Sequence, residues 1–204
     1  MSETPPEIPS SATSAVPSAV RLNFVIGLCA IAISVASFYA TYLQAQSAEQ
    51  QVKAMTYPLI QFYTSNYDVE TKERALSFTL KNSGVGPAII RNVEYSYDGA
   101  AVKDGIFGLL MACCEEAMEE FRKASRKRES NDGQLVTSGD TNVILPANDV
   151  INPLYLLHNP VNAPLWEQLN VERRKMSVAI CYCSLLDQCY RAESATEVEE
   201  VPSC

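Results

Sequence analysis

The sequence predicts one N-terminal transmembrane α-helix followed by a mainly-β soluble domain (α+β) with an inserted amphipathic helix. Three observations predict this class. A long run near the N-terminus contains no charged residue, several short runs after residue 58 alternate apolar and polar side chains, and residues 104–129 repeat apolar side chains at helical spacing. A period of two indicates half-buried strands, and a period of 3.6 indicates a helix.

The uncharged run begins at Phe24, ends at Leu43 and reads FVIGLCAIAISVASFYATYL. An α-helix of this length crosses a bilayer core roughly 30 Å thick and satisfies its own backbone hydrogen bonds there. We therefore expect residues 22–43 to form a transmembrane helix that anchors the chain in a membrane.

The segment before the run distinguishes an uncleaved signal-anchor from a cleaved signal peptide. A signal peptide carries a basic n-region and a shorter apolar core. This segment contains Glu3 and Glu7 and has no Lys or Arg before Arg21. We therefore expect an uncleaved anchor, with residues 1–21 as a disordered tail rich in Ser, Pro and Thr.

Residues 44–57 predict a polar helical stalk, because they contain good helix formers and no Gly or Pro until Pro58 ends the helix. The stalk lacks an apolar heptad seam, so we interpret it as a spacer rather than a coiled coil. Arg21 and the α-amino group precede the span and Lys53 follows it. This bias places the N-terminus inside and the C-terminal domain outside.

The soluble domain, expected over residues 58–193, begins with strand patterns. Residues 59–64 are apolar and aromatic, and residues 76–80 alternate apolar and polar side chains. A corner at residues 82–87 holds two glycines, which permit positive φ, and a proline that ends ladder pairing. Residues 88–97 form the next pattern and end at the turn pair Asp98-Gly99. We expect the strands on either side of the corner to be antiparallel partners.

This strand–NSGVGPA–strand segment, residues 74–99, resembles one that recurs in small immunoglobulin-like sandwich modules of bacterial membrane and envelope proteins. The resemblance implies an immunoglobulin-like β-sandwich and a bacterial-like protein. It implies no functional residue, because turn geometry accounts for the glycines and the proline.

Residues 104–129 predict an amphipathic helix with glutamates between its apolar positions. The C-terminal end of this helix carries five basic residues: Arg122, Lys123, Arg126, Lys127 and Arg128. One interpretation is a solvated helix end, in which Glu119 pairs with Lys123 and the cations oppose the helix dipole. The other is that these five side chains contact anionic lipid head groups.

Two further strands are predicted at residues 141–145 and 151–157. We expect the second at a sheet edge, because Pro153 cannot donate a ladder hydrogen bond. Asn162 followed by Pro164 predicts the start of a short helix that ends near Leu169. Trp166, the only tryptophan, is interpreted as a core anchor rather than a ligand platform.

The closing segment predicts a hairpin. Residues 176–183 alternate as a strand, and a loop at residues 185–187 returns the chain so that Cys183 faces Cys189. Opposed Cβ atoms lie about 4.5–5.5 Å apart, near disulfide range. A disulfide requires an oxidising compartment, so we expect the domain on the extracytoplasmic side of the plasma (inner) membrane. Residues 194–204 are read as an acidic flexible tail.

Several classes of chemistry are excluded by residue counts and motifs. His158 is the only histidine, which excludes a zinc site built on several histidines, a histidine relay and a haem ligand pair. The sequence contains no GxxxxGK[ST], GxGxxG, GxSxG or CxxC motif. The net charge of −8 argues against nucleic-acid binding. We expect no enzymatic activity, no catalytic or cofactor-binding residue and no metal.

Three functional hypotheses remain. The favoured one is a membrane-anchored protein that presents its β domain to another protein or to a copy of itself. The alternative is a redox or metal-handling protein that uses the hairpin cysteines. A third is a cytoplasm-facing sensor whose basic segment meets lipid or nucleotide.

Overall fold

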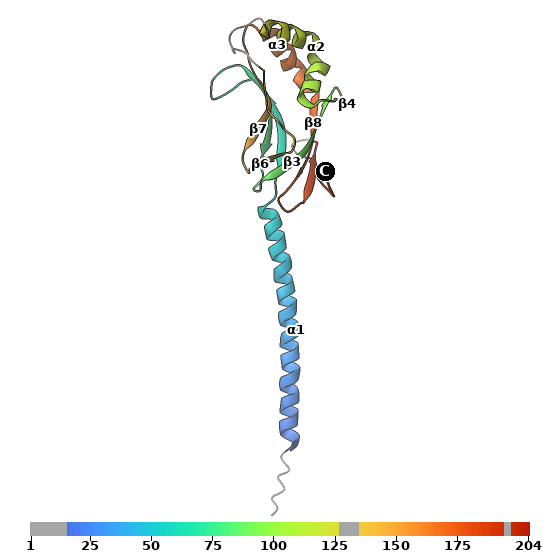
Figure 1. The fold of residues 1–204 in the computed structure, drawn as a ribbon. Coiled ribbons are helices and arrows are strands. Elements are labelled where there is room, and N and C mark those ends of the chain that lie inside the picture. Colours follow the sequence, from blue (N-terminus) through green and yellow to red (C-terminus); the bar gives the residue numbers. More distant parts are fainter. Residues whose placement is uncertain (1–15, 127–134, 194–196) are drawn as a thin grey trace, which may run out of the picture. The chain divides into compact units, whose positions relative to one another are not determined.

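The computed structural model describes residues 16–126, 135–193 and 197–204. The chain divides into two compact units, Met1–Gln51 and Val52–Cys204. The first consists, in its described part, of one long apolar helix, and the second is a mainly antiparallel β-sheet domain (Figure 1).

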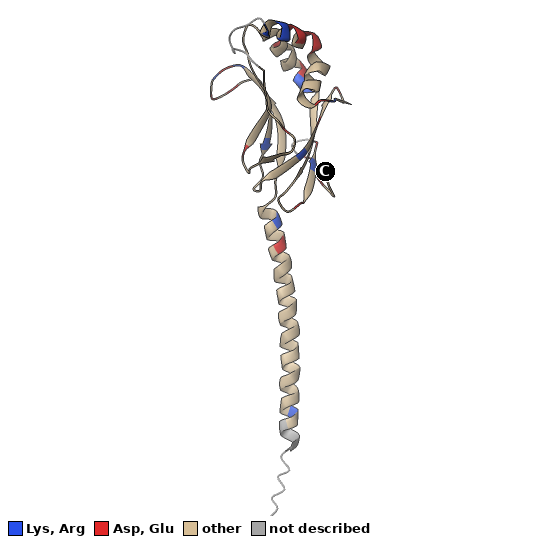
Figure 2. Cartoon of the chain, in the orientation of Figure 1, with Lys and Arg blue, Asp and Glu red and all other residues tan. Residues whose placement is uncertain are grey.

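Helix α1 (Val16–Met55) is continuous over 40 residues. Its part Val20–Met55 is long and apolar enough to cross a membrane, and none of its most apolar window is buried. Figure 2 shows a long stretch of α1 without charged residues. The hydroxyls of Ser34 and Thr41 donate to the carbonyl oxygens four residues earlier, both at 2.8 Å. The helix thus satisfies these polar groups internally, as hydrocarbon surroundings would require.

The β domain contains two sheets. The four-stranded sheet has the order β1-β2-β7-β5. Its strands are β1 (Ile60–Ser65), β2 (Ala75–Asn82), β7 (Val150–Leu157) and β5 (Leu135–Thr137). The six-stranded sheet has the order β10-β9-β8-β3-β4, with β6 paired to β3. Its strands are β10 (Val198–Val201), β9 (Cys189–Ala192), β8 (Met176–Cys183), β3 (Ala88–Tyr97), β4 (Ala100–Ala101) and β6 (Val143–Leu145).

Two helices complete the domain. Helix α2 (Gly105–Ser125) packs on β3 and on α3 (Ala163–Glu172), and a single 3₁₀ turn, η1 (Arg173–Lys175), leads from α3 into β8. Figure 1 shows α2 and α3 together at one end of the β domain. Both sheets and both helices contribute to one hydrophobic core, represented by Leu80, Tyr182, Leu110 and Trp166. The prediction that Trp166 is a core anchor is confirmed, since only 1% of it is exposed.

The strands on either side of the Gly-rich corner are not partners. β2 pairs with β1 and β7, whereas β3 pairs with β8, β4 and β6, so the expected antiparallel pair is wrong and the corner carries the chain between sheets. Asn82 stabilises this crossing from inside. Its Nδ2 donates to the carbonyls of Gly86 (2.8 Å) and Leu145 (3.1 Å), and its Oδ1 accepts the N–H groups of Leu59 (3.2 Å) and Gly84 (3.0 Å).

The two corner glycines also act differently from expectation. Among the described glycines only Gly99 and Gly105 have positive φ. A Cβ at Gly84 would lie 2.4 Å from the Leu59 nitrogen, and one at Gly86 would lie 2.1 Å from the Thr56 oxygen. Close approach of the backbone, rather than a left-handed conformation, therefore requires glycine here.

Strand β7 lies inside its sheet, so the expectation that Pro153 marks an edge strand is wrong. β7 pairs with β2 on one side and β5 on the other. The register against β2 shifts between Phe78 and Leu80, and β5 pairs only from Leu154 onward. Proline is tolerated because it falls at this irregularity, where the ladder does not require its N–H.

The C-terminal segment is ordered differently from the expected flexible tail. Val198–Val201 forms β10 on the edge of β9, and Cys204 is disulfide-bonded to Cys181 of β8. Residues 194–196 lie outside the described residues. Composition predicted a solvated acidic tail, but a strand with exposed Glu199 and Glu200 keeps both carboxylates in water while its backbone pairs with β9.

Candidate functional site

The outer face of the four-stranded sheet contains a groove of 360 Å³. β2 places the short side chains of Ala75, Ser77 and Thr79 along it. The flanking strands place tyrosines beside them, because Tyr63 of β1 pairs with Thr79 and Tyr155 of β7 pairs with Ser77. Alternate residues of a strand point to the same face, so a row of short side chains runs between larger rings and hollows the face.

The loop between β1 and β2 adds Tyr67, Val69 and Glu70 to the lining of the groove. Asp68 holds this loop in place. Its Oδ1 accepts the N–H groups of Glu70 (2.9 Å) and Thr71 (3.2 Å), and its Oδ2 accepts the hydroxyl of Tyr155 (3.0 Å). The loop is thereby connected directly to β7.

These hydrogen bonds set the charge of the groove. The backbone N–H of Thr71 and then the Tyr155 hydroxyl hold the pKa of Asp68 below its ordinary value, so Asp68 is anionic at neutral pH. Burial and the hydrogen bond to Asp68 raise the pKa of Tyr155, so its hydroxyl stays protonated and continues to donate. Together with Glu70, Asp68 makes this part of the groove negative.

Two tyrosine rings of the groove are accessible from outside. Tyr63 and Tyr67 are 45% and 48% exposed, which leaves large amphipathic rings available to a partner. The Thr79 hydroxyl is already engaged, since it donates to Asn152 Oδ1 at 2.8 Å. Tyrosine is enriched in protein interfaces because it offers apolar area and a polar handle at low entropic cost.

Sequence reasoning missed this groove because its residues come from three separate segments between positions 63 and 155. A signal for it exists in the strand patterns. Outward positions of a half-exposed strand are usually polar, whereas Tyr63 and Tyr155 occupy such positions with large aromatic rings.

The predicted hairpin cysteines lie beside two others. β8 and β9 pair with Cys183 opposite Cys189, the register expected from the loop, and these two are disulfide-bonded. Cys181, on the same strand, is bonded to Cys204. The sulfur of Cys183 is also 3.7 Å from that of Cys204, so the two disulfides are adjacent.

This cysteine cluster could hold a metal only in reduced form. The sulfur atoms of Cys183, Cys189 and Cys204 lie within 4.8 Å of one another. A thiolate, not a disulfide sulfur, is the metal ligand, and three thiolates would supply three of the four ligands of a tetrahedral zinc site. In the disulfide-bonded form these atoms are unavailable for coordination.

The basic segment predicted to contact lipid lies at the end of α2. Arg122, Lys123 and Arg126 are exposed there, and Lys123 lies 3.7 Å from Glu119. This pair matches the solvated helix end. Lys127 and Arg128 lie outside the described residues, so the cluster is described only in part, and contact with lipid stays a prediction.

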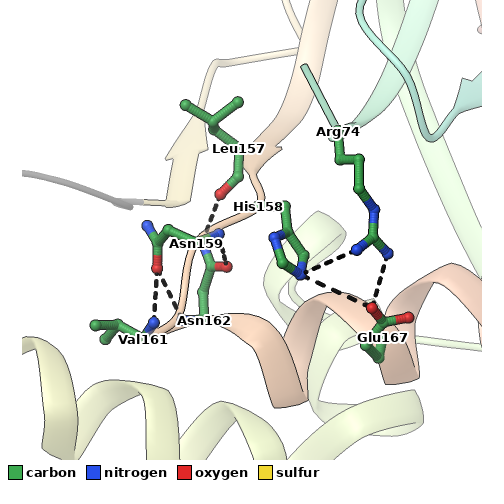
Figure 3. Close-up of polar contacts among 7 residues, drawn as sticks. All are labelled: Arg74, Leu157, His158, Asn159, Val161, Asn162 and Glu167. Atoms are coloured by element: carbon green, nitrogen blue, oxygen red, sulfur yellow. Dashed lines mark hydrogen bonds and ion pairs between the residues drawn. The ribbon is translucent and has the colours of Figure 1, made fainter.

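A polar cluster joins the residue before β2, the residue after β7 and helix α3 (Figure 3). Arg74 Nη2 donates to Glu167 Oε1 at 2.7 Å, and Arg74 Nη1 lies 3.4 Å from His158 Nε2. The guanidinium also lies 4.2 Å from the centre of the Trp166 ring, which His158 meets edge-on. Arg74 and Glu167 are each about half exposed, so their ion pair adds little stability.

In the turn before α3, Asn162 bonds the backbone on either side of His158. Asn162 is fully buried, and its Nδ2 donates to the Leu157 carbonyl at 2.6 Å while its Oδ1 accepts the N–H of Asn159 at 2.9 Å. Asn162 precedes the helix as expected, but its side chain ties the turn together and makes no capping hydrogen bond.

Comparisons of the chain with protein-family models, with curated proteins and with solved structures found no match.

Proposed function

We propose that this chain is a single-pass membrane protein that presents an immunoglobulin-like β-sandwich domain to another protein. In this proposal an uncleaved signal-anchor holds the domain outside the cytoplasm, at the plasma (inner) membrane. The observation that carries the binding function is the tyrosine-lined groove on the outer face of the four-stranded sheet. No catalytic step is part of the proposal.

Exposed apolar surface on α1 supports the membrane anchor. Along α1, the large side chains of Phe24, Ile31 and Phe38 are 70%, 67% and 77% exposed. A contiguous apolar surface of this size on a soluble protein would drive association, whereas a bilayer accommodates it.

The cysteine pairs and the two sheets support the other parts of the proposal. Cys181–Cys204 and Cys183–Cys189 are disulfide-bonded, which suits an oxidising compartment. The two sheets share one core, and the corner around Asn82 carries the chain from one to the other. That connection suits a sandwich.

The orientation is tested by C-terminal fusion to a phosphatase that folds only outside the cytoplasm and, in parallel, to a fluorescent protein that folds only inside. We expect phosphatase activity without fluorescence. The opposite result would overturn the extracytoplasmic placement and favour the cytoplasm-facing sensor.

The chemistry of the groove supports a proposal about the kind of partner. Short side chains along β2 leave room for an extended polypeptide, and the flanking tyrosines offer rings against which its side chains pack. Asp68 and Glu70 place negative charge on the groove, so a Lys or Arg of the partner is favoured there. We infer an extended segment of another protein that carries a basic side chain.

Photo-crosslinking in intact membranes tests this binding site. A photoreactive amino acid replaces Val69, which is 78% exposed and lines the groove. We expect one discrete adduct, and we expect Tyr63→Ala with Tyr67→Ala to reduce its yield at least about tenfold, as the loss of two aromatic anchors implies.

The matched control is Leu185→Ala with Leu186→Ala, which removes comparably exposed side chains (56% and 48%) from the β8–β9 loop. The adduct should survive this change. An adduct of two copies of the chain would show self-association instead of a foreign partner. Failure to form any adduct, or equal loss in the control, would overturn the groove as the binding site.

The cysteine cluster favours a second function, redox or metal handling. The specific observation is the proximity of the sulfurs of Cys183, Cys189 and Cys204. Alkylation under denaturing, non-reducing conditions distinguishes the two functions. Structural disulfides leave these three cysteines unlabelled, whereas a thiolate metal site leaves them labelled after chelation and releases about one zinc ion per chain.

A further inference from the structure

Helix α2 contains a disulfide between neighbouring residues, Cys113 and Cys114. The helix is interrupted at this point, because Cys114 has φ −144° and ψ 36°. Helical residues lie near φ −63° and ψ −42°. Cys114 is fully buried, whereas Cys113 is partly exposed.

This bond cannot be explained as a stabilising crosslink. A disulfide stabilises a fold chiefly by closing a loop in the unfolded chain, and the effect shrinks with the loop. The other two pairs close separations of 6 and 23 residues, whereas Cys113–Cys114 closes a separation of 1. It constrains almost nothing in the unfolded chain and interrupts a helix in the folded one.

We propose that Cys113–Cys114 is a redox-active pair that exchanges electrons with a dithiol and sets the bend in α2. The proposal is independent of the groove and of the hairpin cysteines. Its partner is defined by chemistry as a protein or small molecule with two neighbouring thiols.

The exchange proceeds in two balanced steps. A thiolate of the incoming dithiol attacks the sulfur of Cys113, which is the accessible one, and the Cys113–Cys114 bond breaks with Cys114 leaving as a thiolate that takes up a proton. The second thiolate of the dithiol then attacks the mixed disulfide and releases Cys113. Two electrons pass to the pair, and the dithiol becomes a disulfide.

Reduction has a structural consequence at the contact between α2 and α3. The carbonyl of Cys113 accepts a hydrogen bond from Gln168 Nε2 of α3 at 3.1 Å. Once the covalent link is gone, Cys114 is free to adopt helical dihedrals, and this carbonyl can enter the helical ladder. The exposed glutamates that follow the bend then shift relative to α3: Glu115, Glu116, Glu119 and Glu120.

The test uses the full-length chain in detergent, equilibrated in buffers of increasing reduced-to-oxidised dithiothreitol ratio, then alkylated and analysed by mass spectrometry. We expect Cys113 and Cys114 to become labelled at a ratio at least about tenfold lower than Cys181, Cys183, Cys189 and Cys204, a difference of about 30 mV. Amide hydrogen exchange around Cys114 should slow on this first reduction.

The double variant Cys113→Ser, Cys114→Ser should show the slow exchange of the reduced protein in every buffer, and Cys183→Ser, Cys189→Ser is the matched control that should retain the switch. Labelling of Cys113 and Cys114 before any reductant is added would overturn the proposal. So would their reduction together with the other pairs, or a first reduction that leaves exchange in α2 unchanged.

Discussion

At the scale of single residues, Asn82 joins backbone segments that are distant in the sequence. No local sequence pattern indicates this role. It is fully buried, and its amide group bonds four backbone groups from the corner, from β6 and from the segment that enters β1. Buried polar groups are tolerated when they are fully hydrogen-bonded. Here one side chain satisfies the backbone of a crossing between two sheets.

We therefore expect Asn82→Ala to lower the free energy of unfolding by at least about 3 kcal/mol, since it leaves several buried backbone groups without their partner. Chemical denaturation monitored by tryptophan fluorescence measures the loss. Asn92→Ala is the control, because Asn92 is exposed and its side chain donates to the exposed carboxylate of Glu94 at 2.9 Å. Its effect should stay within about 0.5 kcal/mol, and similar losses in both variants would contradict this role for Asn82.

Gly86 provides a second prediction at this scale. Gly86→Ala should destabilise the domain by about 2–3 kcal/mol, because its Cβ would lie 2.1 Å from the Thr56 carbonyl oxygen and backbone must move. Gly139→Ala meets nothing within 4 Å and should be neutral or stabilise by less than about 1 kcal/mol. Thermal melts compare the two. A neutral Gly86→Ala would show that the close approach does not constrain the corner.

At the scale of elements, two disulfides hold the β8–β9 hairpin and the segment of β10 together at one edge of the six-stranded sheet. Cys183–Cys189 joins the two strands of the hairpin, and Cys181–Cys204 joins β8 to the residues after β10. β10 is a short strand with exposed glutamates, which is a common way to protect a sheet edge from unwanted pairing. The disulfide at Cys204 holds this edge strand in place.

Removing either disulfide should lower the melting temperature without preventing folding. We expect Cys183→Ser with Cys189→Ser to cost about 1–3 kcal/mol, and Cys181→Ser with Cys204→Ser to cost about 1 kcal/mol more, because the second pair closes the longer loop. Differential scanning calorimetry under oxidising conditions measures both. The reverse order would show that native-state packing, rather than chain entropy, determines their effect.

At the scale of the whole molecule, the chain combines a compact β domain with an apolar helix, α1, whose described side chains are exposed. The described part of the first unit has no core of its own, so its apolar surface needs another environment. We propose that this environment is a membrane. In that case the apolar helix determines where the β domain lies.

Arginine substitutions test that environment. We expect Ile31→Arg with Ile33→Arg to abolish retention in carbonate-washed membranes, because each arginine near the centre of a span costs about 2.5–3.5 kcal/mol. The control Gln46→Arg with Gln50→Arg makes the same change on the polar part of α1 and should be retained. Retention of the first variant would refute the span.

Elements whose signal is local could be predicted from the sequence. The apolar helix follows from the uncharged run, α2 from its helical period, and the β8–β9 register from the three-residue loop that places Cys183 opposite Cys189. Asp98-Gly99 turns β3 into β4 with positive φ at both residues. In each case the residues that decide the conformation lie within a few positions of one another.

Only the tertiary structure decided which strands are partners and which side chains meet. Pairing of β2 with β7 rather than β3, the inner position of Pro153 and the ordering of β10 all depend on contacts between distant segments. The same holds for the groove, where Tyr63 and Tyr155 come from different strands, and for Cys204, which reaches Cys181. Alternation of apolar and polar side chains specifies which face of a strand is buried. Long-range packing and hydrogen bonding determine which strands are its neighbours.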